Sequence, residues 1–408
     1  MRCLALATWL LLSAAMASAQ EADPPRSKKG LQVQMVDDAL ALGIAHATLN
    51  VQLGHLVERL DEDGRPVLRE ASLRALDAQV RPLAAAGVEL NFILLARATG
   101  RAEIDALQFD PRYDARAPNQ LGAFRVLDEA GQRYLRAVLT QLADRYGPGS
   151  EVGRVRGWIV GNEVNSHWWW YNLGRAELKD VVAAYEPAVR LVHEVVAARD
   201  ADARVYVSLE HHWQARFAAG DAEQACSGRV LLDAFAARAR EGGDFPWHVA
   251  FHPYPENLFD CRFWEDTTAR AEVTTPRITF KNLEVLTDYL TRTELQWQGQ
   301  PRRVILSEQG FHCRDDPTGE RDQAAAFALA WRKVESLPGI DAFIYHRHVD
   351  HAHEGGLRFG LYENRPGSVA DPGRKRLIWE LLRVCDTPVG GRVLGQVIAQ
   401  MQADADED

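Results

Sequence analysis

The sequence predicts an α/β fold, a single-domain (β/α)8 TIM barrel, from two observations. Short apolar runs alternate with segments of helical spacing through most of the 408 residues. Eight such runs can be counted if residues 30–35 are admitted as the first strand, and eight alternating β and α units favour a closed parallel barrel. The alternative is an open doubly wound sheet, but the glycine-rich turn expected after an early strand of that fold is absent from the sequence.

Each predicted strand is a short run rich in apolar and β-branched residues. The predicted strands are residues 30–35, 44–51, 88–95, 155–160, 204–209, 247–251, 303–307 and 342–345. The predicted helices are residues 36–42, 72–86, 128–146, 176–199, 230–240, 282–295, 322–337 and 375–382. Ser72 and Gly87 supply a start and a stop signal for one helix, and Pro187 predicts a kink in another. Residues 61–64 predict a turn, and residues 109–124 a long loop.

Composition and charge are those of an ordinary soluble globular protein. The chain is 47% hydrophobic and 25% charged, with a formal net charge of −10. A nucleic-acid partner usually requires a basic face, so none is expected. We expect a barrel over residues 30–385, preceded by a flexible lead-in at 20–29. A C-terminal extension follows at 386–408, and its acidic end at 403–408 is expected to be disordered.

Residues 1–19 are predicted to be a signal peptide. Arg2 provides a positive start, residues 4–12 an apolar core, and Ala17-Ser18-Ala19 a small-residue cleavage site. The apolar core is too short to span a membrane, and no later run reaches about 18 apolar residues. We therefore expect a periplasmic or secreted protein without a membrane anchor.

Four cysteines remain after the predicted signal peptide, and an oxidising compartment permits one or two disulfides among them. They are Cys226, Cys261, Cys313 and Cys385. We expect the pairing Cys226–Cys261, because both residues fall in loops after neighbouring predicted strands. Four buried free thiols are the alternative. The wide, irregular spacing is not that of a zinc site.

Two predicted strands each end in a glutamate. Residues 155–160 are followed by Gly161, Asn162 and Glu163, and residues 303–307 by Glu308. All strands of a parallel barrel open on one face at their carboxyl ends, so residues distant in sequence converge there. Retaining glycosidases hold such a pair of carboxylates about 5–5.5 Å apart, one as acid/base and one as nucleophile. A helix cap or a loop ion pair is the alternative role for each glutamate.

Aromatic and polar side chains follow the same strands and are candidates for contact with a sugar. Residues 168–171 are four consecutive aromatics, which cannot all face the core, so some are expected to line the cleft. Arg97 at the end of the third strand could bind sugar or pair with a loop carboxylate. The residues expected to bind substrate are Asn162, His252, Tyr254, Trp168, Trp169, Trp170, His211, Tyr345 and His346.

Three motifs in this order resemble those of the retaining (β/α)8 glycoside hydrolases called clan A. They are Gly161-Asn162-Glu163 on strand four, His252-Pro253-Tyr254 after strand six, and Ser307-Glu308-Gln309-Gly310 on strand seven. The resemblance implies Glu163 as acid/base and Glu308 as nucleophile. It also implies Asn162 on the sugar 2-hydroxyl and Tyr254 hydrogen-bonded to the nucleophile, with an oligo- or polysaccharide substrate and no cofactor.

The chain departs from that clan at two strand ends and looks similar to an uncharacterised bacterial branch of it. Residues 50–52 replace an arginine that many members carry after strand two. Residues 345–348 replace a tryptophan platform after strand eight. Both departures concern the substrate more than the chemistry.

Two other functions are compatible with the sequence. A non-catalytic sugar-binding barrel would use the same cleft without cleaving its ligand. A metal-dependent hydrolase would use the densest histidine cluster, which surrounds Asp350. The histidines of this cluster are His346, His348, His351 and His353.

Overall fold

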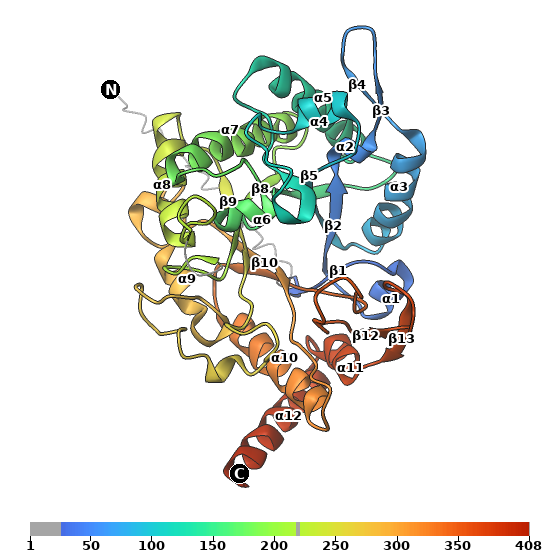
Figure 1. Cartoon of the computed structure of the whole chain (residues 1–408). Helices are drawn as coiled ribbons and strands as arrows, with labels where there is room; N and C mark the ends of the chain where they lie inside the picture. Colours follow the sequence, from blue (N-terminus) through green and yellow to red (C-terminus); the bar gives the residue numbers. More distant parts are fainter. Residues whose placement is uncertain (1–25, 218–220, 408) are drawn as a thin grey trace, which may run out of the picture.

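The polar ends of eight parallel strands meet at one mouth in the computed structural model, which describes residues 26–217 and 221–407. The strands form a ring with helices outside it (Figure 1). The barrel strands are β1 (Lys29–Gln32), β2 (His46–Gln52), β5 (Glu89–Arg97), β7 (Val155–Val160), β8 (Arg204–Glu210), β9 (Trp247–His252), β10 (Val304–Gln309) and β11 (Ile340–Tyr345). The ring closes because β1 pairs with both β2 and β11, and β2 with β5. The predicted fold is confirmed.

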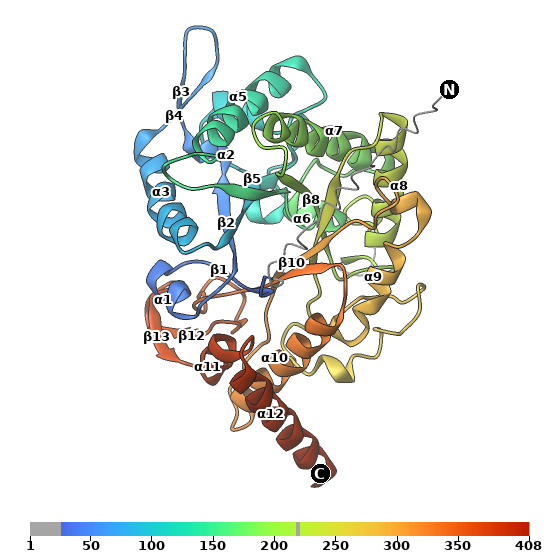
Figure 2. The same cartoon turned by 180° about the vertical axis from the view of Figure 1, so that it is seen from behind.

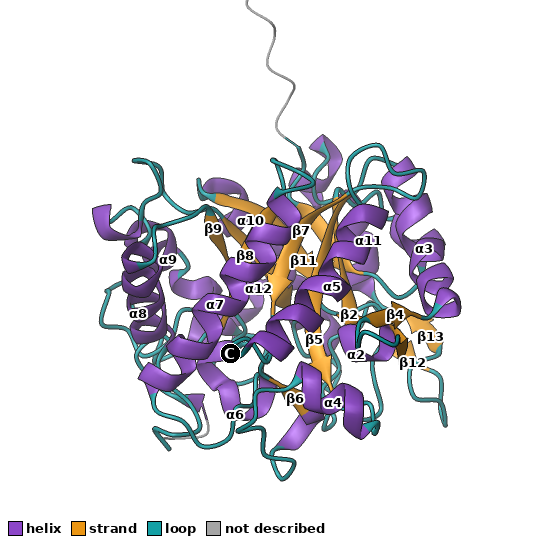
Figure 3. Ribbon diagram, turned by 90° about the horizontal axis from the view of Figure 1, so that it is seen from above, coloured by secondary structure: helices purple, strands orange, loops and turns teal. Residues whose placement is uncertain are grey.

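Helices alternate with these strands along the chain, and the longer ones cover the outside of the barrel (Figure 3). They are α1 (Val36–Ala41), α2 (Leu53–Leu56), α3 (Glu70–Ala85), α4 (Ala102–Gln108), α5 (Glu129–Arg145), α6 (His167–Trp170), α7 (Leu178–Ala197), α8 (Gly228–Glu241), α9 (Glu284–Tyr289), α10 (Gly319–Ser336), α11 (Leu377–Val384) and α12 (Pro388–Glu407). Sequence signals set several helix starts: the Asp128 side chain accepts a hydrogen bond from Gly131 N at the start of α5, and Ser227 accepts one from Val230 N at the start of α8.

The apolar core has two layers because side chains alternate along each strand. One set points into the barrel, and the larger set lies between the strands and the helices. The buried cluster inside the barrel is Ile93, Leu95, Leu121, Ile159, Tyr206, Ala250, Ile305, Ala342 and Ile344. This packed interior supports the polar residues that follow the strands.

Several loops of the barrel contain short additional strands. The turn predicted at residues 61–64 joins β3 (Val57–Leu60) to β4 (Pro66–Leu68), and the hairpin projects from the barrel (Figures 1 and 2). The loop predicted at residues 109–124 contains β6 (Leu121–Gly122), which pairs antiparallel with β5. After β11, β12 (Tyr362–Asn364) pairs with β13 (Pro372–Lys375).

The two ends of the chain differ from the sequence prediction. The signal peptide predicted at residues 1–19 lies outside the described residues. The described part of the predicted flexible lead-in is anchored, because Arg26 donates to the Gly87 carbonyl and Lys28 to the Val334 carbonyl. The C-terminal extension forms α12, in which Leu394 and Ile398 are buried and which packs on α10 and α11. The helix continues through residues 403–407, which were predicted to be disordered.

The predicted Cys226–Cys261 disulfide is wrong: the four cysteines among the described residues are buried free thiols. Cys226 lies before α8, where its amide donates to the Asn165 carbonyl, and its thiol is close to Glu210. Cys261 instead lies near Asp322 of α10. Both cysteines lie in loops after neighbouring strands, but this does not bring the two thiols together.

No helix among the described residues has both the length and the apolarity to cross a membrane.

Candidate active site

A cavity of about 480 Å³ opens at the carboxyl ends of the barrel strands. Every strand, or the loop that follows it, contributes at least one side chain to its wall. In strand order these include Gln32, Asn50, Arg97, Glu163, Glu210, Tyr254, Glu308 and His346. The cavity is thus the point where residues far apart in the sequence meet, as expected at this face of a barrel.

The backbone after β7 directs Glu163 into this cavity. Gly161 has a φ of 71°, and a side chain there would meet the Tyr171 ring at 2.6 Å, so glycine is required. Glu163 itself is left-handed, with φ 42° and ψ 52°, a conformation that costs energy for a residue with a Cβ. Its amide donates to Ser208 Oγ on β8 at 2.9 Å, which helps to hold this conformation.

Glu210 at the end of β8 fixes the loop that carries Glu163. Its Oε1 accepts hydrogen bonds from Asn165 Nδ2 at 2.5 Å and Ser166 Oγ at 2.8 Å. Its Oε2 accepts from the amide and from Nδ1 of His212. Burial raises the pKa of Glu210, but the His212 hydrogen bond and charge outweigh this and lower the pKa to about 2. Glu210 is therefore an ionised anchor whose oxygens are already occupied.

Glu163, Glu308 and His252 form a compact cluster. One ligand atom from each lies within 4.8 Å of the other two, so the two carboxylates face each other across the cavity. His252 is 1% exposed and bridges the strands: Nδ1 donates to Glu163 Oε1 at 2.7 Å, and Nε2 donates to Ser307 Oγ at 3.0 Å. His252 therefore positions Glu163 from behind instead of lining the cavity.

Burial and charge set the protonation of this cluster. Burial raises the pKa of Glu163, the His252 hydrogen bond lowers it, and the charge of Glu308 raises it, leaving it raised overall. Burial lowers the pKa of His252, but the Glu163 hydrogen bond and the charge of Glu308 outweigh this, so its pKa is raised. Glu163 and His252 therefore each hold a proton more tightly than the same side chain does in water, and for Glu163 this is what a general acid requires.

Tyr254 links the strand-six loop to Glu308. Its hydroxyl donates to Glu308 Oε1 at 3.1 Å, and its own carbonyl accepts from His211 Nδ1 at 3.0 Å. Burial and the Glu308 charge raise the pKa of Tyr254, so it remains a neutral donor. Burial also lowers the pKa of His211 to about 4, which leaves a neutral ring at the cavity wall.

The other predicted substrate-binding residues divide into two groups. Asn162, Trp170 and His346 line the cavity, with His211 and Tyr254. Trp168 and Trp169 do not line it; the Trp169 ring instead contacts Phe217, which does. The prediction for Tyr345 is wrong: its side chain is buried among the core aromatics, and its hydroxyl donates to the Phe359 carbonyl.

The histidines after β11 do not converge on one point among the described residues. His348 is buried, donates from Nε2 to Asp38 and accepts the amides of Gln34 and Met35 at Nδ1. His346 instead faces the cavity beside Gln32 and Glu354. Because His348 is committed to β1 and α1, this cluster does not form the ligand set that a metal-dependent hydrolase would require.

A family model matches residues 21–403. The chain belongs to DUF5722, a family of unknown function. A comparison with curated proteins finds no match.

Solved structures share the barrel at low sequence identity. A family 39 glycoside hydrolase from Bacteroides cellulosilyticus WH2 matches 89% of this chain and 64% of its own, with a TM-score of 0.58 and 13% identity. A monomeric β-xylosidase from Caulobacter crescentus CB15 matches 87% of this chain and 67% of its own, with a TM-score of 0.51 and 16% identity. A glucosidase from Croceicoccus marinus matches 90% of this chain and 68% of its own, with a TM-score of 0.51 and 14% identity. The chain thus spans about two thirds of their length, and the likeness shows the fold.

Two cavity carboxylates of this DUF5722 chain are not among the predicted site residues. Glu210 follows an apolar strand just as Glu163 and Glu308 do, so the same signal could have identified it. Glu354 lies in the loop after β11, where its Oε1 accepts from Arg347 Nη1 at 2.5 Å. No local pattern marks Glu354, because only the path of the loop brings it to the cavity.

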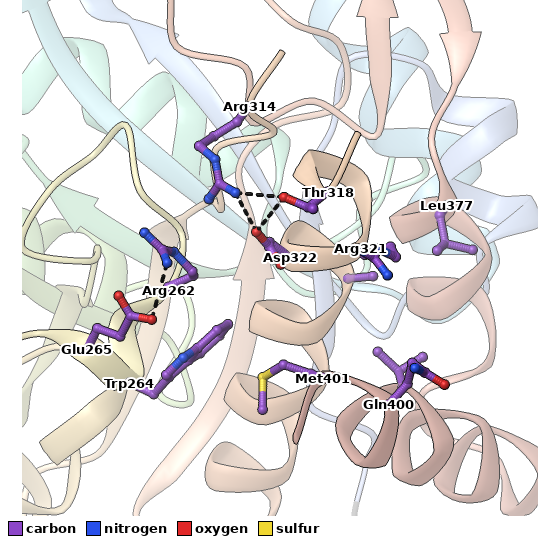
Figure 4. A pocket seen from close by; sticks show the side chains of 12 residues that line it. Arg262, Trp264, Glu265, Arg314, Thr318, Arg321, Asp322, Leu377, Gln400 and Met401 are labelled. Carbon is purple, nitrogen blue, oxygen red and sulfur yellow. Dashed lines mark hydrogen bonds and ion pairs between the residues drawn. The ribbon is translucent and has the colours of Figure 1, made fainter. Parts of the chain in front are cut away.

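A second cavity, of about 530 Å³, lies between α10, α12 and the loop around Trp264 (Figure 4). Its charged side chains face one another: Arg314 donates to Asp322 at 2.6 Å, and Arg262 pairs with Glu265 at 3.3 Å. None of the glutamates of the barrel mouth lines it. Both of these arginines already have carboxylate partners, and the facing carboxylates Glu163 and Glu308 lie at the barrel mouth, so the barrel mouth is the better candidate for the reaction site.

Proposed function

We propose that this chain is an exported retaining glycoside hydrolase that cleaves a β-linked glycan by double displacement. The observation that carries the proposal is the approach of Glu163 and Glu308, which have carboxylate oxygens within 4.8 Å of each other. A separation of about 5–5.5 Å between carboxyl groups is typical of retaining enzymes, whereas inverting enzymes leave about 6.5–9.5 Å for a water molecule. The activities of two structural relatives, a xylosidase and a glucosidase, agree with this class.

In the first step Glu308 attacks the anomeric carbon as the bond to the leaving oxygen breaks. Protonated Glu163 gives its proton to that oxygen, so the aglycone departs as a neutral alcohol and a glycosyl ester forms on Glu308. Tyr254 holds Glu308 in place, and His252 holds Glu163. In the second step Glu163, now a carboxylate, takes a proton from water as the water oxygen attacks the anomeric carbon. The bond to Glu308 breaks, which releases the sugar and restores the Glu308 carboxylate.

A non-catalytic sugar-binding barrel is the main competitor. A binding protein would not require two facing carboxylates. Here one of them, Glu163, is buried and has a raised pKa. Holding such a pair together costs free energy, and active sites are where such costs recur. The geometry therefore favours catalysis over binding alone.

The proposal is tested with aryl β-glycosides and β-linked polysaccharides, followed by proton NMR of the first-formed product. We expect hydrolysis with the β configuration retained. A first-formed α product would contradict double displacement, and binding without cleavage across the panel would support the competitor. Inactivation by a chelator, reversed by added metal, would revive the metal-dependent alternative.

Replacing His252 with glutamine is expected to move the alkaline limb of the kcat/KM profile to higher pH. The His252 hydrogen bond and charge lower the pKa of Glu163. A neutral side chain removes the charge, so Glu163 would keep its proton to higher pH. The hydrogen bond is charge-assisted, and its loss should lower kcat/KM about 10- to 150-fold, the equivalent of about 1.5–3 kcal/mol.

The matched control is His193→Gln, because His193 stacks on Phe245 on the outer side of the barrel. This variant should leave the pH profile unchanged. An alkaline limb at the wild-type pH in His252→Gln, despite a native fold by circular dichroism, would mean that His252 does not act on Glu163.

A further inference from the structure

The charges of the barrel mouth are distributed unevenly. The wall formed after strands four to eight carries every carboxylate of the cavity: Glu163, Glu210, Glu308 and Glu354. The wall formed by strands one to three carries amides and one cation: Gln32, Asn50, Gln52 and Arg97. A ligand that enters this cavity thus meets a negative side and a side that is neutral or positive.

The guanidinium of Arg97, the last residue of β5, is unpaired among residues 26–217 and 221–407. Its carbonyl accepts a hydrogen bond from Gln108, but its side chain makes no hydrogen bond or ion pair with any part of the chain that the structure describes. The residue is partly buried and its side chain lines the cavity. The alternative of a loop carboxylate as its partner is not realised.

Neighbouring charges are committed elsewhere. Asp105 is close enough to act, with Arg97, on Tyr113, but it accepts hydrogen bonds from Thr99, Gly100 and Gln108 instead. The second arginine of the cavity, Arg347, is already paired with Glu354. Of the two arginines that the described residues place in the cavity wall, Arg97 is therefore the one that remains available to a ligand.

A partly buried guanidinium without a counter-charge loses hydration without compensation. Its planar fork matches the two oxygens of a carboxylate or a sulfate. Because β5 lies beside β7, the strand that leads to Glu163, an anion at this wall would be held by the Arg97 guanidinium, whose attraction offsets the repulsion from the neighbouring carboxylates. The unpaired guanidinium thus selects the type of group that binds at this wall.

We propose that the cavity takes an acidic glycan, in which a uronate carboxylate or a sulfate ester binds Arg97. This inference rests on the proposed glycoside hydrolase function and adds the substrate class. The neutral amides beside Arg97 would accept and donate hydrogen bonds to the hydroxyl groups of the same sugar, as polar residues do in sugar sites.

Matched ligand pairs test this by calorimetry, independently of turnover. One pair is a β-linked glucuronate-containing oligosaccharide and its carboxyl-reduced counterpart; the other is a sulfated oligosaccharide and its desulfated counterpart. Wild type is compared with Arg97→Met and with the control Arg74→Met, which removes an exposed charge on α3. We expect wild type and the control to bind one acidic form at least about tenfold more tightly than its neutral partner. Arg97→Met should lose that preference and bind the neutral forms as wild type does.

The two arms distinguish a carboxylate from a sulfate. Equal or tighter binding of both neutral forms by wild type, no binding of any form, or a preference retained in Arg97→Met would overturn the inference. Retaining hydrolysis of neutral glycans with no acidic preference would leave the hydrolase proposal standing and remove only this one. If binding of the acidic form depends on Arg97 but no β-glycan is cleaved, the acidic-ligand proposal stands and the hydrolase proposal fails.

Discussion

Replacing Glu308 with alanine is expected to lower kcat by at least about 10⁴-fold, because the variant has no group to form the glycosyl ester. The side chain of Glu308 is partly exposed at the cavity wall and accepts a hydrogen bond from the Tyr254 hydroxyl. Its loss therefore leaves no void in the packed core, and the variant should keep the stability of wild type in thermal unfolding. Activity is measured with an aryl β-glycoside whose leaving group needs no proton.

Azide provides the decisive measurement for this variant. A small anion can occupy the space left by the carboxylate and attack the anomeric carbon from the same side, giving an α-glycosyl azide. The matched control is Glu103→Ala, which removes an exposed carboxylate from α4. Hydrolysis by Glu308→Ala within tenfold of wild type, or no azide product from any cleaved substrate, would exclude Glu308 as the nucleophile.

The positions of Glu163 and Glu308 could be predicted from sequence because each follows an apolar strand and precedes or follows a glycine. Parallel strands then bring their ends together whatever the loops do. The barrel was predictable for the same reason, since it depends on the alternation of elements more than on their bounds.

Tyr345 shows what a strand pattern leaves undetermined. Side chains alternate along β11, so either Ile344 or Tyr345 faces the barrel interior. Ile344 belongs to the interior cluster and Tyr345 to the layer beneath the helices. His346 then returns to the cavity. Both side chains are buried and neither position is marked by a polar residue, so the sequence does not show which of the two faces the barrel interior.

The predictions for His252 and for the cysteines failed because their positions depend on contacts between loops and neighbouring strands. His252 shares its orientation with Ala250 of the barrel interior, but only the chain trace places it between Glu163 and Ser307. The sequence identified it as a substrate contact because it could not show which polar residues lie behind the cavity wall. The same lack of loop geometry produced the mistaken Cys226–Cys261 pairing.

Replacing Glu163 with glutamine is expected to lower kcat/KM about 10²- to 10⁴-fold for glycosides whose leaving oxygen must be protonated. Glutamine keeps the size of the side chain and can still pair with His252, so the left-handed backbone at this position is retained. Activated aryl glycosides should lose far less in the first step, because their leaving groups depart as anions. The alkaline limb of the kcat/KM profile should disappear with the proton that Glu163 no longer carries.

Azide separates the two glutamates by product configuration. In Glu163→Gln the glycosyl ester on Glu308 still forms with activated substrates, and azide, which needs no general base, then displaces it. That second displacement gives a β-glycosyl azide, the opposite anomer to the one expected from Glu308→Ala. If both variants gave the same anomer, or if Glu163→Gln lost equal activity on activated and unactivated substrates, the assignment of acid/base and nucleophile to these two residues would fail.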